Sequence, residues 1–402
     1  MSETQKHTKP NVPNLRFPGF EGEWSVSTIK DEFELYSGNT PSRLDKNNYI
    51  GEINWITSGE LKDHYIGDTK EKISENSAID NNLKLLPEGT FVIAIYGLEA
   101  EGVRATGSIT KKRATISQAC MAFTPKGKVS NEFLYSWYKK HGNLIGIKYA
   151  QGTKQQNLSY DIIERLTIRY PSSQEQKKLN SFISLLDNRI AIQNKVIEQY
   201  ESLIRAIILR CQSSSSSQKV YLREILTERK ELNERGYVIC SVSVSKGIIN
   251  QVEYLGRSFA AKETAHYHVV HKGDLVYTKS PTGEFPYGII KQSYLSIPVA
   301  VSPLYGVYEP VDYETGVYLH HFFCSPQNTK NYLHKLIQKG AKNTINITNQ
   351  HFLDNQIRLP KRDDLYAIVA AIEDICAKVE LECKTLDLFE QQRLYFLSKM
   401  YI

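Results

Sequence analysis

Hydrophobic residues recur at alternating steps of four and three along two long, otherwise polar stretches of the chain. The first stretch places them at Leu179, Ile183, Leu186, Ile190, Ile197, Tyr200, Ile204 and Ile207. The second places them at Ile368, Ile372, Ile375, Val379, Leu386, Phe389 and Phe396. An alternation kept over about four heptads is typical of a coiled-coil seam, and neither stretch contains proline or glycine. The pattern predicts two long helices, at residues 172–211 and 363–402, that pack as an antiparallel coiled coil.

A polar residue interrupts the seam once in each stretch, at the same place in the heptad pattern. These residues are Gln193 and Glu382. In an antiparallel pair the midpoints of the helices meet, so we expect the two side chains to face each other and to fix the register. The alternative is that each side chain reaches solvent separately. The expected N-caps are Ser172 or Ser173 for the first helix and Asp363 or Asp364 for the second.

Similar segments precede the two predicted helices. "NLSYDIIERLTIRYP" spans Asn157 to Pro171 and "NITNQHFLDNQIRLP" spans Asn346 to Pro360, so both copies end in Ile-Arg-x-Pro. The same shift of 189 positions relates the two helical patterns. An internal repeat of this length indicates a duplicated structural unit. The predicted order is domain, helix, domain, helix, and pairing of the helices implies pseudo-twofold symmetry.

The regions before the two helices share an order of elements. Apolar runs predict strands, namely "TFVIAIYG" and "DLVYTKS" after glycine turns, followed by "QACMAFTP" and "IPVAVSPLYGVYEP". One short helix is predicted in each region, at "NEFLYSWYKKHG" and "YLHHFFCSPQNTKNYLHKLIQKG". The fold class is therefore α+β. We predict an N-terminal arm at 1–20, mixed α/β domains at 21–171 and 219–362, and a flexible polyserine linker, "QSSSSSQ", at 212–218.

Composition and charge narrow the class of protein. The chain has 402 residues, a net charge of +6 and six cysteines without a Cys-x-x-Cys pair. A modest positive charge permits binding to a polyanion, and scattered thiols suit a reducing cytoplasm. No apolar stretch approaches the length of a membrane span, and the polar N-terminus lacks the features of a secretory signal. We expect a cytoplasmic protein of two or more domains that does not enter a membrane.

Four local strings and the repeated arrangement point to a known family. The strings are "VPNLRFPGFEGEW", "INWITSGEL", "GTKQQNLS" and "PSSQEQKKL". With them the chain resembles the specificity subunit of type I restriction-modification systems. The resemblance implies that each domain is a target recognition domain for one half of a split double-stranded DNA site. It also implies that the helices space the domains and dock two methyltransferase subunits, through which restriction subunits join.

The resemblance carries expectations about cofactors and about the second helix. S-adenosylmethionine is expected in the partner methyltransferase subunit, and this chain is expected to hold no cofactor. The pair Glu175 and Gln176 after Pro171 has no counterpart in "KRDDLYAIV" after Pro360. We therefore expect the second helix to dock its partner in a less typical way.

A reader of a DNA half-site needs cations for phosphates and amides or hydroxyls for base edges. The candidates in the first domain are Thr57, Ser58, Lys111, Lys112, Arg113, Gln118, Lys154, Gln155 and Gln156. Those in the second domain are Lys279, Ser280, Thr282, Lys342, Asn343 and Asn349. For each residue alone, the alternative is an ordinary solvated surface side chain. Two unlike domains predict an asymmetric bipartite target.

Catalytic motifs are missing from the sequence. There is no Pro-Pro pair for a motif that holds a flipped adenine, no G-x-G-x-x-G and no Walker A loop. His266, His268 and His271 lack a cysteine or carboxylate spacing that completes a metal site. We therefore expect a non-catalytic subunit without a metal. The alternatives are a coiled-coil adaptor without DNA specificity and an enzyme with an unrecognised active site.

Overall fold

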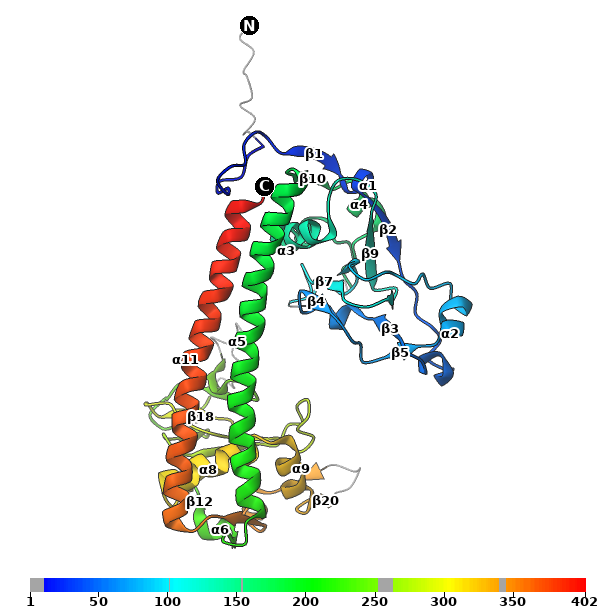
Figure 1. The fold of residues 1–402 in the computed structure, drawn as a ribbon. Helices are drawn as coiled ribbons and strands as arrows, with labels where there is room; N and C mark the ends of the chain where they lie inside the picture. Colours follow the sequence, from blue (N-terminus) through cyan, green and yellow to red (C-terminus); the bar gives the residue numbers. More distant parts are fainter. Residues whose placement is uncertain (1–10, 101, 153–154, 252–262, 340–344) are drawn as a thin grey trace. The chain divides into compact units, whose positions relative to one another are not determined.

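The computed structural model describes residues 11–100, 102–152, 155–251, 263–339 and 345–402, and they form two compact units. Unit 1 contains Met1–Lys195 together with Lys384–Ile402, and unit 2 contains Val196–Cys383. Two long helices, α5 (Ser173–Ser213) and α11 (Arg362–Met400), each contribute one part to either unit (Figure 1). The predicted helices are therefore confirmed. Within the described ranges, no helix is both long enough and apolar enough to cross a bilayer.

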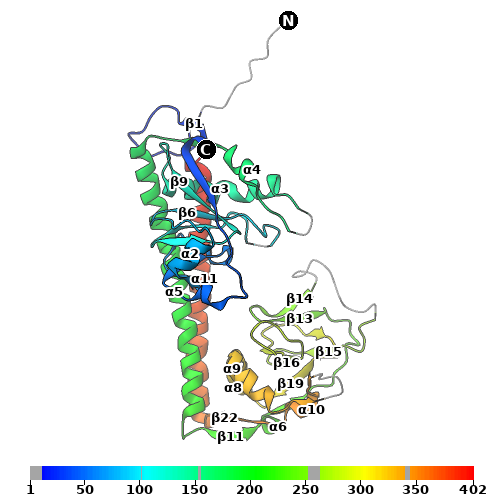
Figure 2. The same ribbon diagram turned by 90° about the vertical axis from the view of Figure 1, so that its right-hand side faces the viewer.

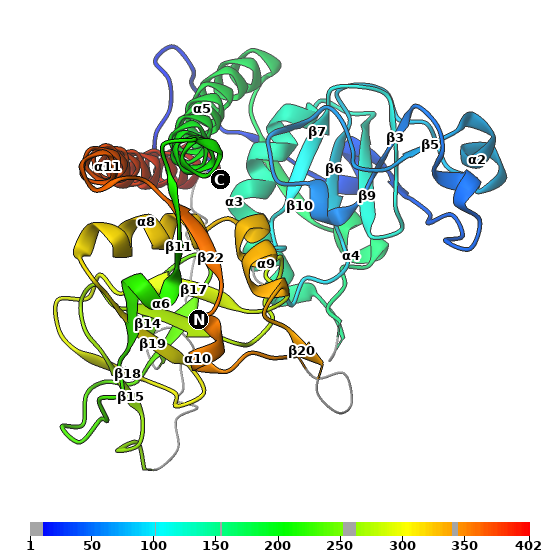
Figure 3. The same cartoon turned by 90° about the horizontal axis from the view of Figure 1, so that it is seen from below.

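Unit 1 is built on a five-stranded sheet with the order β2-β9-β6-β7-β4. All its pairs are antiparallel except β4 with β7. The helix α3 (Asn131–Tyr149) lies along this sheet (Figure 3). The strands are β2 (Phe33–Ser37), β4 (Tyr65–Ile66), β6 (Phe91–Ala94), β7 (Gly107–Thr110) and β9 (Cys120–Pro125). A smaller sheet contains β5 (Lys72–Ile73), β3 (Ile53–Ile56) and β8 (Ala114–Ile116), and further elements are β1 (Ser25–Thr28), α1 (Ile29–Glu32), α2 (Glu75–Asp80), α4 (Tyr160–Glu164) and β10 (Thr167–Tyr170).

Unit 2 is built on a four-stranded antiparallel sheet with the order β12-β19-β16-β17. Its helices α8 (Tyr313–Phe323) and α9 (Pro326–His334) lie along one side of the sheet (Figure 2). The strands are β12 (Leu226–Glu228), β16 (Leu275–Thr278), β17 (Ile289–Gln292) and β19 (Gly306–Pro310). The remaining elements are β11 (Gln218–Tyr221), α6 (Leu222–Ile225), β13 (Cys240–Ser243), β14 (Gly247–Asn250), β15 (His268–Val270), β18 (Val299–Val301), β20 (Gln338–Lys339), β21 (Ile345–Asn346), α10 (Asn349–Phe352) and β22 (Gln356–Leu359).

The repeat in the sequence is a repeat of topology. The order β2-β9-β6-β7 in unit 1 matches β12-β19-β16-β17 in unit 2. The strand of each Ile-Arg-x-Pro copy pairs antiparallel with the strand that opens its domain, β10 with β1 and β22 with β11. The mixed α+β class and the predicted core strands are thus confirmed. The twofold relation between the copies stays a prediction.

Two predicted features of unit 2 are wrong. The single short helix is two helices, because Ser325 caps a new helix at Pro326 by accepting a hydrogen bond from the Asn328 N–H. The polyserine run is not a free linker. Helix α5 extends to Ser213 and β11 begins at Gln218. In the turn between them, the Ser214 and Ser217 carbonyls accept hydrogen bonds of 2.9 and 3.3 Å from Arg358 Nη1.

The two long helices pack antiparallel within unit 1. Phe182 contacts Phe396 with ring centroids 4.8 Å apart, and the Arg189 guanidinium lies 3.9 Å above the Phe389 ring. In unit 2 the other parts of the same helices share one apolar cluster, which includes Ile204, Ile208, Val369 and Ile372. Gln193, of unit 1, is buried, whereas Glu382, of unit 2, is half-buried. Their predicted contact across the seam stays a prediction.

The helix starts match the predicted caps only for α5. The Ser172 hydroxyl accepts from the Glu175 N–H at 3.4 Å, as an N-cap does. Helix α11 begins at Arg362, one residue earlier than predicted, so Asp363 and Asp364 lie in its first turn and do not cap it. Carboxylates in a first turn still favour the helix, since they face the positive end of its dipole.

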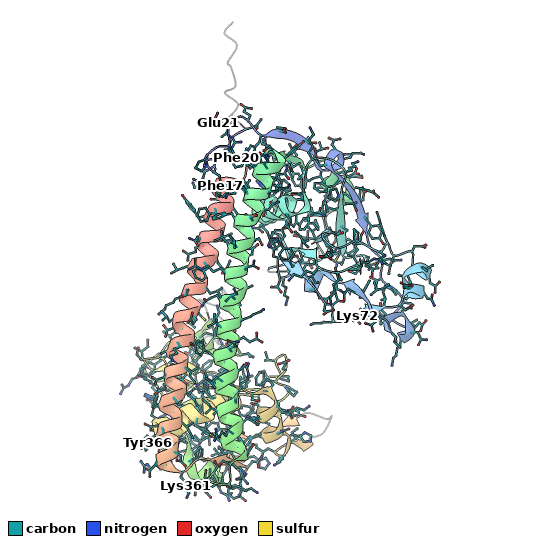
Figure 4. All side chains as sticks on the ribbon, in the orientation of Figure 1. Phe17, Phe20, Glu21, Lys72, Lys361 and Tyr366 are labelled. Atoms are coloured by element: carbon teal, nitrogen blue, oxygen red, sulfur yellow. The ribbon has the colours of Figure 1, made fainter. Side chains whose placement is uncertain are left out.

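An N-terminal segment fastens onto the ends of both helices in unit 1. The Arg16 guanidinium donates two 2.7 Å hydrogen bonds to the Glu175 carboxylate at the start of α5. The Phe17 ring packs edge-on against Phe182, and Figure 4 shows Phe17 at the end of α11. The Leu15 N–H donates to the Lys399 carbonyl at 2.9 Å. The segment therefore closes one end of the helix pair.

Glu175 and Gln176 are internal residues, and the less typical docking expected of the second helix stays a prediction. Their exposed fractions are 1% and 2%. The Gln176 Oε1 accepts from the backbone N–H and the hydroxyl of Ser130, which is the N-cap of α3. Its Nε2 donates to the Lys128 carbonyl at 3.0 Å. The pair therefore locks the N-terminal segment and α3 to α5.

A buried network joins β4 and α3 to the two long helices in unit 1. The His64 ring is stacked between the rings of Tyr65 and Tyr135. Its Nε2 lies 2.9 Å from Glu132 Oε2, and its Nδ1 lies 2.7 Å from Asp187 Oδ2. Asp187 on α5 also pairs with Arg393 on α11. Because both ring nitrogens face carboxylate oxygens, the imidazolium form fits this site.

This geometry predicts a pH dependence for the stability of unit 1. Burial lowers the pKa of His64, but contacts with Asp187 and Glu132 outweigh it, so the pKa of His64 is raised. A raised pKa gives stability that is complete below the unfolded value of about 6.5 and is lost as pH rises through the folded value. We therefore expect the advantage of wild type over His64→Gln, in urea unfolding, to be larger at pH 6 than at pH 9. An equal difference at both pH values would contradict the imidazolium assignment.

Candidate nucleic-acid interface

A groove opens in unit 1 where β6 ends and the Gly152 segment returns to the sheet. Its volume is about 510 Å³. Most of its lining is polar or aromatic, from Ser37, Tyr96, Gln151, Gln155, Asn157, Ser159 and Tyr160. Amides of this kind donate and accept at once, as a base edge requires. The groove is therefore suited to a ligand with both donors and acceptors.

Backbone contacts pin the segment that carries these side chains. Gln151 and Asn157 exchange two N–H···O bonds of 2.9 Å, and the Leu158 N–H donates to the Ile95 carbonyl just after β6. Gly152 has a φ of +118°, and a Cβ there would lie 2.0 Å from the Gln155 carbonyl oxygen. Only glycine fits this position. The described residues on either side are thus held to the sheet, and Gln155 is exposed.

Among the described candidates in unit 1, Gln155 alone lines this groove. Gln156 is held internally, because its Oε1 accepts from Arg104 Nη2 at 2.9 Å. Thr57 caps a short 3₁₀ turn and donates to Glu60 Oε2 at 2.8 Å, and Ser58 follows it in that turn. Lys154 lies outside the described residues. The groove also uses Tyr96 and Tyr160, which the sequence did not single out.

The basic turn after β7 is a separate feature of unit 1. Lys112 Nζ lies 3.3 Å from both Asp68 carboxylate oxygens, and Lys111 Nζ lies 5.3 Å from the centre of the Tyr65 ring. Hydrogen bonds from Lys112 and Lys72 lower the pKa of Asp68. Arg113 and Gln118 are exposed. None of these candidates belongs to the groove lining.

Two candidates of unit 2, Lys279 and Asn349, lie at positions that match residues around the groove of unit 1. Lys279 follows β16 directly, as Ile95 follows β6. Burial lowers the pKa of Lys279, and the charge of Glu228 opposes this. Asn349 Nδ2 donates to Glu228 Oε1 at 2.9 Å, just as the Tyr160 hydroxyl donates to the Leu35 carbonyl in unit 1. The same place in each copy therefore carries different side chains.

The rest of the predicted set in unit 2 divides into two groups. Ser280 and Thr282 are exposed in the loop after β16, where Thr282 and Phe285 exchange two backbone hydrogen bonds. Lys342 and Asn343 lie outside the described residues. Two of the three histidines have partners in the chain, since His271 Nε2 lies 2.7 Å from Glu231 Oε2 and His268 Nδ1 lies 3.2 Å from the Tyr305 carbonyl oxygen, whereas His266 is exposed. Within the described ranges, no three possible metal ligands come together.

Comparison with known proteins gives consistent matches. Residues 21–202 match the family described as the type I restriction modification DNA specificity domain. The specificity subunit of the type I restriction enzyme MjaIX from Methanocaldococcus jannaschii is 29% identical over 44% of this chain and 41% of its own length. The EcoR124I/EcoR124II specificity subunit of Escherichia coli is 24% identical over 51% and 48%. The chain thus spans less than half the length of these curated relatives.

Solved structures share the fold along nearly the whole chain. The S subunit of a type I restriction-modification system from M. genitalium has a TM-score of 0.53 at 15% identity, covering 97% of this chain and 99% of that one. A chain from work on complex assembly in the type I system has a TM-score of 0.50 at 12% identity, covering 96% and 99%. At such identities the likeness shows the fold alone. Residues 21–202 thus match the type I restriction modification DNA specificity domain, and the chain is similar to specificity subunits of type I restriction enzymes.

Proposed function

We propose that the chain selects the DNA target of a type I restriction-modification complex, each unit reading one half of an asymmetric split site. One observation carries the proposal: a single strand order is used twice, with different side chains at matching positions. Tyr96 stands two residues after β6, and Ser280 stands two residues after β16. A shared scaffold with unlike contact residues suits two unlike half-sites.

The groove of unit 1 supplies groups that suit base edges. Gln155 and Gln151 are exposed, and a glutamine amide can bind N6 and N7 of an adenine at once. The two backbone hydrogen bonds between Gln151 and Asn157 limit the entropy that a contact of Gln151 loses on binding. In unit 2, Lys279 offers a cation and Asn349 offers an amide, and both interact with Glu228. Phosphate contacts elsewhere would set the register on the duplex.

The long helices offer apolar surface for partner subunits. In unit 1 the exposed side chains include Leu185 and Ile192 on α5, and Leu388 and Tyr395 on α11. Each pair is spaced by seven residues, so its members share one face of their helix. We assign this surface to a methyltransferase subunit, with a second one on the corresponding parts in unit 2. Restriction subunits would join through the methyltransferase, and S-adenosylmethionine would bind there and not to this chain.

Lengthening both helices should change the gap between the half-sites and leave their sequences unchanged. One heptad would be inserted after Lys195 in α5 and one after Cys383 in α11, where the two units meet in sequence. Seven residues add about 10 Å of helix, which corresponds to about three base pairs. Mapping of methylated sites in cells that carry the chain and its methyltransferase would give both half-sites and the gap.

The control is a chain of unchanged length. In it, the heptad next to each insertion point is replaced by another heptad with the same apolar positions, and the original gap should be kept. Altered half-site sequences in the lengthened chain would refute the role of the helices as spacers. If cells with the wild-type chain show no sequence-specific methylation, the alternative of a coiled-coil adaptor would be favoured. Methyl transfer by the purified chain alone would favour an enzyme.

A further inference from the structure

A second groove, in unit 2, collects positive charge. It opens between α9 and the β11–β22 pair and has a volume of about 370 Å³. Three cationic residues line it, Lys219, Lys335 and Arg358, and none of the described lining residues carries a carboxylate. The remaining lining is mostly amide, including Asn328, Asn331 and Gln356. Its described lining therefore has a net positive charge without an internal counter-ion.

Two of the cations face each other across a strand pair. In the antiparallel ladder of β11 and β22, Lys219 is the direct partner of Arg358. Like charges directly opposite in a ladder are destabilising, because their side chains project from the same face. The matching pair in unit 1 is Val26 with Arg169, which has one cation only. Unit 2 thus carries a repulsion that its copy avoids.

The two copies of the repeated arginine also differ in what they bind. In unit 1, Arg169 Nε donates to the side-chain oxygen of Asn11 at 2.8 Å. In unit 2, Nη1 of Arg358 is fixed by the Ser214 and Ser217 carbonyls. Among the described residues, none accepts a hydrogen bond from its Nε or Nη2. The Nε of Arg169 is thus engaged by an acceptor oxygen. The Nε and Nη2 of Arg358 remain available as donors to a ligand in the groove.

A further hydrogen-bond donor in the groove indicates which kind of ligand the groove suits. The Asn331 Oδ1 accepts from Gln327 Nε2 at 2.7 Å, which leaves its Nδ2 as a donor for a ligand. A planar guanidinium with two free donors matches a phosphate or carboxylate. A single carboxylate has one negative charge, whereas a phosphate offers more acceptor oxygens and up to about two charges. Phosphate therefore suits a site with three cations better.

We propose that Lys219, Lys335 and Arg358 form a phosphate-binding groove in unit 2. The phosphate group comes either from free phosphate or from the backbone of bound DNA. Binding would remove the repulsion between Lys219 and Arg358 and would engage the donors that the serine turn leaves open. The serine run then has a role, since its carbonyls hold the guanidinium in place.

The first test measures thermal unfolding by calorimetry in sodium phosphate and in sodium chloride at matched ionic strength. Wild type should unfold about 2–4 °C higher in phosphate at about ten times its Kd. The Lys219→Val, Lys335→Ala double variant should lose this shift, and valine stands at the position matching Lys219 in the first copy. The control is Lys330→Ala on α9, which removes an exposed lysine outside the groove lining and should keep the shift.

A second arm measures binding of a 30-base-pair duplex against salt, and only this arm rests on the proposed function. If the groove holds backbone phosphate, the double variant should show weaker binding and a shallower salt slope than Lys330→Ala. If it holds free phosphate only, duplex binding should be unchanged while the thermal shift is lost.

Equal behaviour of wild type and double variant in both arms would overturn the groove while leaving the proposed function standing. In low-salt chloride the double variant should unfold no lower than wild type, because repulsion has been removed. A clear loss of stability there would show that the lysines serve packing, and it would also overturn the assignment.

Discussion

Replacing Asp187 with alanine is expected to lower the free energy of unfolding of unit 1 by about 3–5 kcal/mol. The carboxylate serves Arg393, His64 and the Tyr135 hydroxyl together. These partners are buried or nearly so, and the alanine variant leaves Arg393 without its carboxylate and His64 with Glu132 alone. Burial raises the pKa of Asp187, but the contacts with His64 and Arg393 outweigh it and lower the pKa, so the carboxylate is ionised near neutral pH.

Urea unfolding followed by tryptophan fluorescence measures this effect selectively. All three tryptophans, Trp24, Trp55 and Trp137, belong to unit 1. The matched control is Asp387→Ala, which removes an exposed aspartate of α11 in the same unit and should change stability by less than about 0.5 kcal/mol. The double variant Asp187→Leu, Arg393→Leu should recover part of the loss, since it leaves fewer unpaired charges. A loss below about 1 kcal/mol for Asp187→Ala would show that the network is not a source of stability.

Glu175→Ala should destabilise unit 1 by about 3 kcal/mol and release the N-terminal segment. The variant removes both acceptor oxygens from Arg16, whose other donors remain bound to the Gly22 and Glu21 carbonyls. The guanidinium is then held against the helix start without a counter-charge. Trp24 is buried beside Phe133 and Tyr401, so release of the segment should expose its ring.

The measurement combines unfolding with a red shift of Trp24 emission in a chain where Trp55 and Trp137 are phenylalanine. Glu23→Ala is the control, because Glu23 is exposed in the same segment. The pair Arg16→Met with Glu175→Leu should restore most of the stability, as apolar replacements of buried ion pairs often do. An unchanged Trp24 emission in Glu175→Ala would mean that the aromatic contacts of Phe17 and Trp24 hold the segment without the ion pair.

The parts of the fold that the sequence predicted are those with a local, periodic cause. A helix that buries one face has apolar residues every three to four positions, so Leu179, Ile183 and Ile372 predicted α5 and α11. The repeat before each helix is the strand that pairs with the opening strand of its domain, and its Ile residue, Ile168 or Ile357, is buried. Such positions are constrained by neighbours close in the pattern, and a single chain displays them.

The parts that the sequence did not predict depend on partners far along the chain. Nothing near Glu175 announces Arg16, and nothing near Ser214 announces Arg358. Of the residues that line the groove of unit 1, the sequence analysis named only Gln155, which lies in the string "GTKQQNLS" that carries the family resemblance. Tyr96 and Tyr160 face the same space from other segments, and only tertiary packing decides which of 25 tyrosines do so. Polar contacts with large sequence separation therefore account for most of what was missed.

The sharing of α11 between the units sets an order for folding during synthesis. Unit 1 buries Leu397, Met400 and Tyr401, which are translated after residues 196–383 of unit 2, beside Trp24 and Phe133, which are translated before them. At about 5–20 residues per second, a ribosome needs roughly 10–40 seconds to make the intervening half of the chain. Throughout that interval the nascent first unit exposes the apolar surface that residues 384–400 of α11 later cover, and a chaperone could bind there.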